Sequence, residues 1–110
     1  MTGLTRGAVA VVGAGLTRFG TLPGRSATEN CAEAVALALA DAGLSLRDVD
    51  ALFTSNFPQT FAPLHLAEYL GIHPVVMDGS NIGGSVFVAQ LQHAAAALEL
   101  GLCNVALIAM

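Results

Sequence analysis

Apolar and polar residues alternate along the chain in blocks that predict strands and helices in turn. Short uncharged runs rich in Val, Leu or Ile are typical of buried parallel strands, and they lie at residues 8–12, 51–55, 74–77 and 105–109. Longer stretches that suit helices separate them, at residues 26–42, 63–70 and 85–100. Strands that alternate with helices favour an α/β fold with a parallel-type sheet and crossover helices.

Several residues mark the expected ends of these helices. Ser26 and Glu29 fit a capping box, in which each side chain accepts a hydrogen bond from a backbone N–H of the first turn. Gly43 follows the same helix, where a left-handed residue commonly ends it. Pro63 suits a first helical turn, because its missing N–H would have no partner there. These signals place helix ends near residues 26, 43 and 63.

The stretch from residue 85 to residue 98 carries no charged side chain on any side of its predicted helix. A helix at a protein surface normally has one charged face. We therefore predict that this helix is buried on nearly all sides, as a central helix between two layers. A helix at a subunit interface, with no catalytic meaning, is the alternative explanation.

The composition indicates that this chain does not cover its own apolar surface. It has 110 residues, of which 55% are hydrophobic and only 11% are charged, against about 25% charged residues in a typical domain. A small domain has much surface for its volume and needs polar residues to cover it. We expect residues 1–110 to be a partial N-terminal domain, cut off after the strand at 105–109, with the rest of that domain and a C-terminal domain absent.

Charge and cysteine usage exclude several classes of function. The net charge is −4, and the few basic residues are scattered arginines, so nucleic acid is not an expected partner. The longest uncharged stretch, residues 79–98, contains glycines and amides and is too polar for a membrane span. The two cysteines form no CxxC pair. We therefore expect a reduced, cytoplasmic protein.

Chemistry is most plausible in the glycine-containing loop at residues 78–84. The loop follows a predicted strand and leads to a helix N-terminus, where free N–H groups and the positive end of the helix dipole favour an anion or an oxyanion. Ligands of open α/β sheets also bind at the carboxyl ends of strands. We predict that substrate-binding residues lie here: Asn81, Gly83, Gly84 and Ser85.

Segments spread over the whole chain resemble the sterol-carrier-protein and lipid-transfer branch of the thiolase superfamily. They are VGAGLTRFG at 12–20, DAGL at 41–44, LAEYLG at 66–71, and residues 83–101 from GGS onward. The resemblance implies a thiolase fold, built of two similar βαβαβαββ halves with a buried helix from each half in the middle. It also implies a homodimer that acts on acyl-CoA thioesters, in a protein longer than this chain.

One departure from the family pattern affects the chemistry. Thiolases carry their nucleophile in the pattern Cys-x-Ser-Gly-x-x-Ala, and aligning Ser85 and Ala89 with it places Gly83 at the cysteine and Val86 at the glycine. Gly83 cannot hold an acyl group, but Gly83 and Gly84 leave room for backbone N–H groups to reach a carbonyl oxygen. No catalytic residue is identified in this chain.

Cysteine-less members of this branch resemble retro-aldol lyases of β-hydroxyacyl-CoA side chains, including steroid ones. They work beside a small OB-fold, acyl-CoA-binding partner protein. The resemblance therefore implies a lyase of lipid or steroid side chains that needs a general base and stabilisation of a carbanion, with acyl-CoA as substrate and no cofactor. A conventional acetyl-CoA acyltransferase of the same fold and a non-catalytic interaction subunit stay open as alternatives.

The other reactive side chains have structural explanations. Ser85 has no predicted base beside it and is expected to cap the helix. Cys31 and Cys103 lie among apolar residues and are expected in the core. His65 and Glu68 are half a metal site at best and are expected as an exposed pair, so we predict no metal.

Two further candidates are weighed in the same way. His93 lies on the uncharged helix and is expected to be a hydrogen-bonded core histidine rather than a base. Gly13 and Gly15 follow a predicted strand, but Arg18 stands where a dinucleotide fingerprint has its third glycine. A nucleotide-binding domain is therefore not expected.

Overall fold

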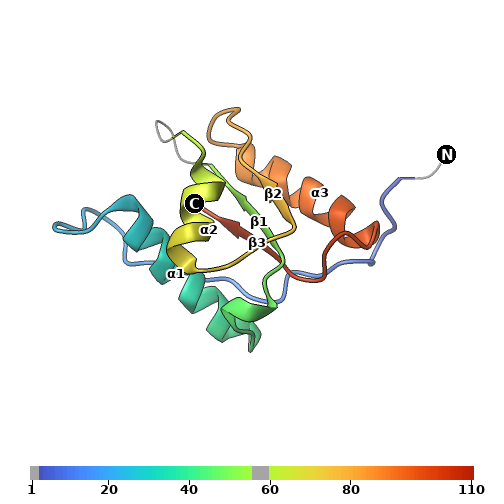
Figure 1. Cartoon of the computed structure of the whole chain (residues 1–110), viewed down its shortest axis with the longest axis horizontal. Helices are drawn as coiled ribbons and strands as arrows, with labels where there is room; N and C mark the ends of the chain where they lie inside the picture. Colours follow the sequence, from blue (N-terminus) through green and yellow to red (C-terminus); the bar gives the residue numbers. More distant parts are fainter. Residues whose placement is uncertain (1–2, 56–59) are drawn as a thin grey trace.

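A computed structural model describes residues 3–55 and 60–110 as an α/β layered structure (Figure 1). Helices α1 and α2 cover one face of a sheet, and helix α3 covers the other. The elements are α1 (Ala27–Ala42), a 3-10 turn (Leu46–Asp48), β1 (Ala51–Thr54), α2 (Ala62–Leu70), β2 (Val76–Asp78), α3 (Val86–Glu99) and β3 (Ala106–Ala109). The predicted α/β class is confirmed.

The three strands run parallel, in the order β2-β1-β3. Ala51 pairs with Val76 on one side and with Ala106 on the other. All three carboxyl ends therefore lie at one edge of the sheet, together with the loop that begins after Asp78. Within the described ranges, no helix is long and apolar enough to span a bilayer.

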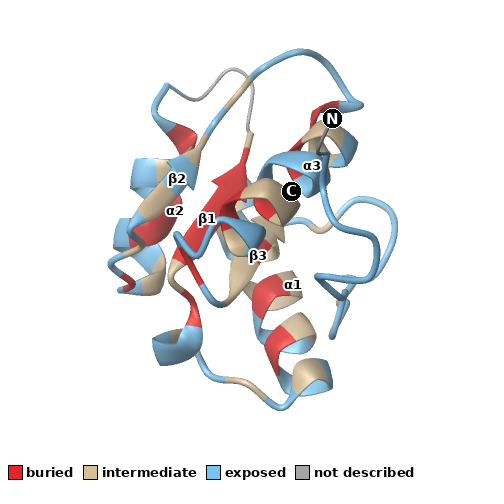
Figure 2. Ribbon diagram, turned by 90° about the vertical axis from the view of Figure 1, so that its right-hand side faces the viewer, coloured by how far each residue is buried: buried red, intermediate tan, exposed pale blue. Residues whose placement is uncertain are grey.

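The strands send alternate residues to the two faces, as the period of a strand requires. Leu52 and Leu107 belong to the core shared with α1 and α2, in which Val35 and Leu66 are also buried. Phe53 belongs to a second core, shared with α3. Because β1 is buried on both faces, its sequence is apolar without alternation (Figure 2).

The helix ends agree with most of the predicted signals. The hydroxyl oxygen of Ser26 accepts a hydrogen bond from the N–H of Glu29 at 3.1 Å. The second bond of a capping box, from the N–H of Ser26 to the Glu29 carboxylate, does not occur in the part of the chain that the structure describes. Half of the capping box is therefore confirmed. Gly43 has φ 71° and its N–H bonds back to Ala40 and Leu39. Pro63 lies in the first turn of α2.

The strand predicted at residues 8–12 is wrong. In the described ranges this segment pairs with no strand, and Val11 is 76% exposed. It is held elsewhere: the N–H of Thr5 bonds to Glu99 on α3 at 2.9 Å, and the N–H of Ala14 bonds to Asp41 on α1 at 3.0 Å. These anchors hold the segment on the helices, away from the free edge of β3.

Two glycines explain how closely this segment approaches α1. A Cβ on Gly13 would lie 2.5 Å from the carbonyl oxygen of Ala38, and one on Gly15 would lie 2.5 Å from that of Ala34. No side chain fits in either place without moving backbone. Both glycines are therefore needed for the close contact of this segment with α1.

The prediction that α3 is buried on all sides is wrong for this chain by itself. The face toward the sheet is buried, with Val86, Gln90, Ala94 and Ala97. The opposite side is open, and Val88 is 73% exposed. The absence of charge therefore leaves an apolar face of α3 uncovered in these 110 residues.

Candidate functional site

The predicted substrate-binding residues form one exposed loop at the N-terminus of α3. Asn81, Gly83, Gly84 and Ser85 are all exposed, and they follow directly on the carboxyl end of β2. The structure thus brings the predicted residues together at the edge of the sheet where ligands of α/β proteins bind. Whether they bind substrate stays a prediction.

Backbone geometry leaves hydrogen-bond donors available in this loop. Gly83 has φ 97°, a left-handed conformation that side chains rarely adopt, and a Cβ built on it would meet nothing within 4 Å. Its carbonyl accepts from the N–H of Val86 at 3.1 Å. Among the described residues, the N–H groups of Gly84 and Ser85 have no acceptor. The loop can therefore offer two amides to an incoming oxygen.

Ser85 does not perform the capping role predicted for it. It stands at the N-cap position, but its side chain accepts no hydrogen bond from the helix. Its backbone carbonyl instead accepts from Val88 and Ala89. The φ of −85° and ψ of 3° at Ser85 are not the extended values of a capping residue, which explains the loss.

Asp78 holds the start of the loop through both of its carboxylate oxygens. Oδ1 accepts from the N–H of Ser80 at 2.9 Å and from its hydroxyl at 2.7 Å, and Oδ2 lies 2.6 Å from Nδ1 of His93. Desolvation by partial burial raises the pKa of this carboxyl. The hydrogen bonds from Ser80 and His93 together outweigh it, so the pKa of Asp78 lies below the ordinary 3.8.

His93 was predicted as a hydrogen-bonded core histidine, and only the hydrogen bond is confirmed. Its side chain is 48% exposed, so the core position is wrong. Its partner is Asp78 at the end of β2, whose carboxylate lies 2.6 Å from Nδ1 of the ring. The sequence could not show this, because the two residues lie far apart in the chain and meet only through the packing of α3 on the sheet.

Gln90 is a functional candidate that the sequence analysis missed. Its side chain is fully buried, and Nε2 donates to the carbonyl of Thr54 at 3.1 Å and to that of Asp78 at 3.4 Å. It thus joins the ends of β1 and β2. The available signal was its spacing, because Gln90 lies four residues from both Val86 and Ala94 on the buried face of α3.

Neither cysteine belongs to this loop, since Cys31 lies in α1 and Cys103 precedes β3. Cys103 is buried, and Cys31 is partly buried against the core shared with α1 and α2, as predicted. Burial raises the pKa of both thiols, and the charge of Asp50 raises that of Cys103 further. Both groups therefore stay protonated and poorly nucleophilic at neutral pH.

The predicted surface pair on α2 is confirmed in its exposure. His65 and Glu68 are both exposed on that helix. No cluster of His, Cys, Asp and Glu that could hold a metal ion occurs within residues 3–55 and 60–110.

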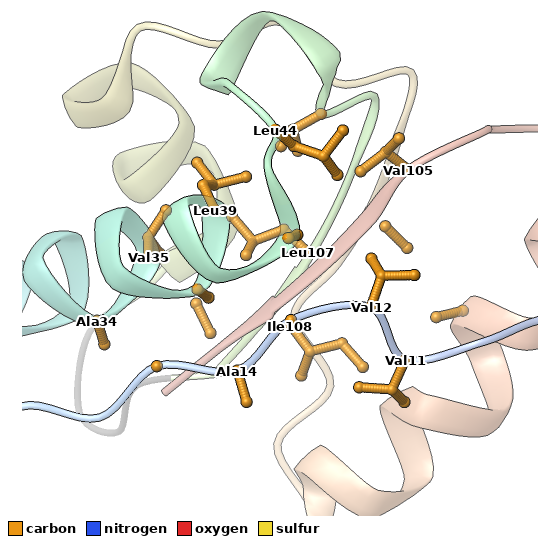
Figure 3. Close-up of a pocket in the computed structure, with 18 of the residues that line it drawn as sticks. Val11, Val12, Ala14, Ala34, Val35, Leu39, Leu44, Val105, Leu107 and Ile108 are labelled. Carbon is orange, nitrogen blue, oxygen red and sulfur yellow. The ribbon is translucent and has the colours of Figure 1, made fainter.

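An apolar groove of about 640 Å³ runs between the N-terminal segment and β3 (Figure 3). Its walls come from residues 9–17, from α1 and α3, and from β3 and its flanks, with Val11, Val12, Leu39 and Ile108 among the side chains that line it. The edge of β3 that faces away from β1 pairs with no strand in the described ranges. The sequence predicted uncovered apolar surface but not this groove.

The comparisons with known proteins agree with the fold. No family model matches the chain. Over 100 residues, 90% of this chain and 26% of the relative, it is 41% identical to the 17-hydroxy-3-oxo-4-pregnene-20-carboxyl-CoA lyase of Mycobacterium tuberculosis. The chain thus spans about a quarter of that protein.

Solved structures give the same result. The Ltp2-ChsH2(DUF35) aldolase matches with a TM-score of 0.80 and 35% identity, over 90% of this chain and 26% of the other. A monomeric SCP2-thiolase-like protein type 1 from Mycobacterium smegmatis matches with a TM-score of 0.71 and 27% identity, over 88% and 22%. The chain is similar over most of its length to proteins of the SCP2-thiolase-like class, and the resemblance seen in its sequence is confirmed. Within that class, the proteins it is similar to include steroid acyl-CoA lyases and aldolases.

Proposed function

We propose that this chain is part of an acyl-CoA lyase that cleaves a carbon–carbon bond of a β-hydroxyacyl-CoA by a retro-aldol reaction. The observation that carries the proposal is Gly83. Where the family resemblance expects a nucleophilic cysteine, the chain has a residue with no side chain, on an exposed loop and in a left-handed conformation. The names of the relatives, a carboxyl-CoA lyase and aldolases, support the same chemistry.

The two cysteines of the chain do not replace the missing nucleophile. Cys31 lies in α1 and Cys103 precedes β3, and both thiols have raised pKa values. A covalent acyl-enzyme needs a thiolate within reach of the thioester. A reaction without a covalent intermediate therefore fits these residues better than thiolysis does.

The proposed reaction breaks the bond between Cα and Cβ of the substrate. A general base takes the proton of the β-hydroxyl group, a carbonyl forms at Cβ, and the electron pair of the broken bond moves onto Cα and the thioester oxygen. The resulting enolate is then protonated at Cα. The N–H groups of Gly84 and Ser85 are proposed to stabilise the enolate oxygen, in the manner of an oxyanion hole.

The thioester itself accepts the electron pair, so the proposed reaction needs no cofactor. The substrate side chain is proposed to be that of a lipid or a steroid, by analogy with the relatives. The general base is assigned to none of the described residues. The proposal therefore makes this chain a contributor of the oxyanion loop and not of the whole catalytic site.

The test is product analysis with the intact protein. A β-hydroxyacyl-CoA incubated without free CoA should yield a carbonyl compound and a shortened acyl-CoA whose thioester is intact. Replacement of Ser85 by Pro removes one proposed donor and should lower kcat by about 10²-fold, the usual cost of losing one oxyanion-hole donor. Robust cleavage that consumes free CoA would instead identify a conventional thiolase.

A partner protein of the DUF35 type is proposed for the intact enzyme, because the matching aldolase carries ChsH2(DUF35) in its name. An OB-fold acyl-CoA-binding protein and a homodimer were both expected from the resemblance. One structural neighbour is described as monomeric, so the homodimer stays a prediction. Light scattering of the protein with and without a DUF35 partner distinguishes these assemblies.

We also propose that residues 1–110 form part of a larger N-terminal domain whose next strand fills the groove beside β3. The βαβαβαββ pattern of the resemblance provides one more strand after that of residues 105–109. Val11 is 76% exposed here and would be buried by such a strand. Val11→Asp should therefore be nearly neutral in residues 1–110 alone and costly, by about 2–4 kcal/mol, in a protein that supplies the strand.

A further inference from the structure

The start of the proposed substrate loop is fixed from two sides by contacts that are independent of one another. On one side Gly79 lies directly on α2, where a Cβ would come within 2.6 Å of Cγ of Pro63. On the other side α3 provides Gln90 and His93, which are three residues apart and so lie on neighbouring turns of one face. The loop thus leaves β2 between two helices.

Each of the two α3 side chains holds a different part of the strand end. Gln90 donates to the carbonyls of Thr54 and Asp78, at the end of the pairing between β1 and β2, where the last register pair is Phe53 with Asp78. His93 holds the Asp78 carboxylate at 2.6 Å, and that carboxylate in turn accepts from the N–H and hydroxyl of Ser80. A continuous chain of hydrogen bonds therefore runs from α3 through Asp78 into the loop.

The two polar atoms of the buried Gln90 side chain differ in their hydrogen bonding, because only the nitrogen has partners. Its Oε1 is buried and has no hydrogen-bond partner among the described residues. A buried acceptor without a donor costs about 1–3 kcal/mol. The side chain is therefore oriented by its amide nitrogen, which is held on the two strand-end carbonyls.

We infer that Asp78, Gln90 and His93 are positioning residues that fix where the loop at 79–85 holds its free amides. The expected effect of these residues on catalysis rests on the proposed function, whereas their expected effect on the loop does not. His93 lies two turns of α3 away from Ser85, so these residues are not placed in contact with substrate. They act on the substrate only through the loop.

The experiment compares His93→Ala with His93→Asn in the intact protein. The amide nitrogen of an Asn side chain can take the place of Nδ1 beside Asp78, whereas Ala leaves that carboxylate without its partner on α3. His65→Ala, which removes an exposed histidine from α2, is the matched control. Hydrogen exchange of the amides at 79–85 is measured without ligand, and kcat and KM are measured with a β-hydroxyacyl-CoA.

We expect His93→Ala to speed exchange at 79–85 and to lower kcat/KM, each by about tenfold, the effect of losing a hydrogen bond to a charged group. His93→Asn should restore both to within about twofold, and His65→Ala should change neither. Unchanged exchange at 79–85 in His93→Ala overturns the inference. So does a loss that His93→Asn does not restore and that extends evenly over β1 and β3, because that outcome shows a general structural role. If the wild-type protein has no lyase activity, the proposed function fails, and loop exchange alone still decides the positioning role.

Discussion

At the carboxyl ends of β1 and β2 the chain makes its own polar contacts, whereas along the free edge of β3 it leaves an apolar groove open. In the first region Gln90 and Asp78 connect helix, strands and loop through hydrogen bonds of 2.6–3.4 Å. In the second region Val11 and Val12 are mostly exposed beside an unpaired strand edge. The two regions differ in how far the described residues satisfy their own contacts: the first is hydrogen-bonded, and the second leaves apolar side chains and a strand edge uncovered.

The difference also separates two uses of glycine. Gly13 and Gly15 are required because a side chain would collide with the backbone of α1. Gly83 has open space around it and is required by its φ of 97°. Gly13 and Gly15 line the groove, and Gly83 sets the backbone shape of the proposed site. Substitutions at these positions therefore test the two regions separately.

Among the substitutions that compare the two regions, the largest effect is expected from Gly15→Ala, which disrupts the wall of the groove. The new Cβ would lie 2.5 Å from Ala34 O and Ala38 N, which are backbone atoms that cannot turn aside. We expect a loss of about 2–3 kcal/mol in the free energy of unfolding, measured by urea denaturation. Gly84→Ala, where nothing lies within 4 Å, should cost far less. Equal losses in the two variants would show that the N-terminal segment does not pack on α1.

Gln90→Leu is expected to come next, because it removes the polar link between β1 and β2. Leu fits the buried position but leaves the carbonyls of Thr54 and Asp78 without this donor. The expected loss is about 1–2 kcal/mol by thermal or urea unfolding. Gln92→Leu, on the exposed side of the same helix, is the control and should stay within about 0.5 kcal/mol of wild type. A neutral Gln90→Leu would mean that apolar burial at this site fully replaces the two hydrogen bonds.

A smaller effect is expected from Gly83→Ala. A left-handed residue with a side chain costs about 1 kcal/mol relative to glycine. The change should appear in the unfolding free energy, and it should also lower kcat if the loop must keep its shape during catalysis. Wild-type stability and activity in this variant would contradict the assigned conformation of the loop.

The smallest effect is expected from the titration of Asp78. Its pKa is lower in the folded protein than the ordinary 3.8, so its hydrogen bonds contribute stability above the unfolded pKa and lose that contribution as the pH falls through the folded value. Stability measured by urea denaturation should therefore decline below about pH 4. Asp78→Asn should flatten this decline, and Glu68→Gln, which removes an exposed carboxylate, should leave it in place. A decline that is the same in Asp78→Asn would assign it to other groups.

Local signals in the sequence were sufficient for most of the fold. The helices were predicted within about two residues of their ends, helped by Gly43 after α1 and by Pro63 in the first turn of α2. Three of the predicted strands were found. Of these, β1 is buried throughout and is apolar without alternation, whereas Met77 in β2 is exposed. The strand predicted at 8–12 was wrong, because an apolar run shows that a segment is suited to burial but not that a partner strand is present.

The site was predicted only in part, for a similar reason. The loop at 79–85 follows from glycines and a helix start, which are local. The contact of His93 with Asp78 and that of Gln90 with Thr54 depend on how α3 lies across the sheet, which no local pattern gives. The open side of α3 was missed because an uncharged helix sequence favours burial but does not show which of its sides another element contacts.

Intact mass spectrometry of the protein during turnover of an acyl-CoA shows whether an acyl-enzyme forms although Gly83 stands where a nucleophile is expected. We expect products to accumulate while the protein mass stays unchanged. A protein mass raised by one acyl group, on any residue of this chain, would contradict it.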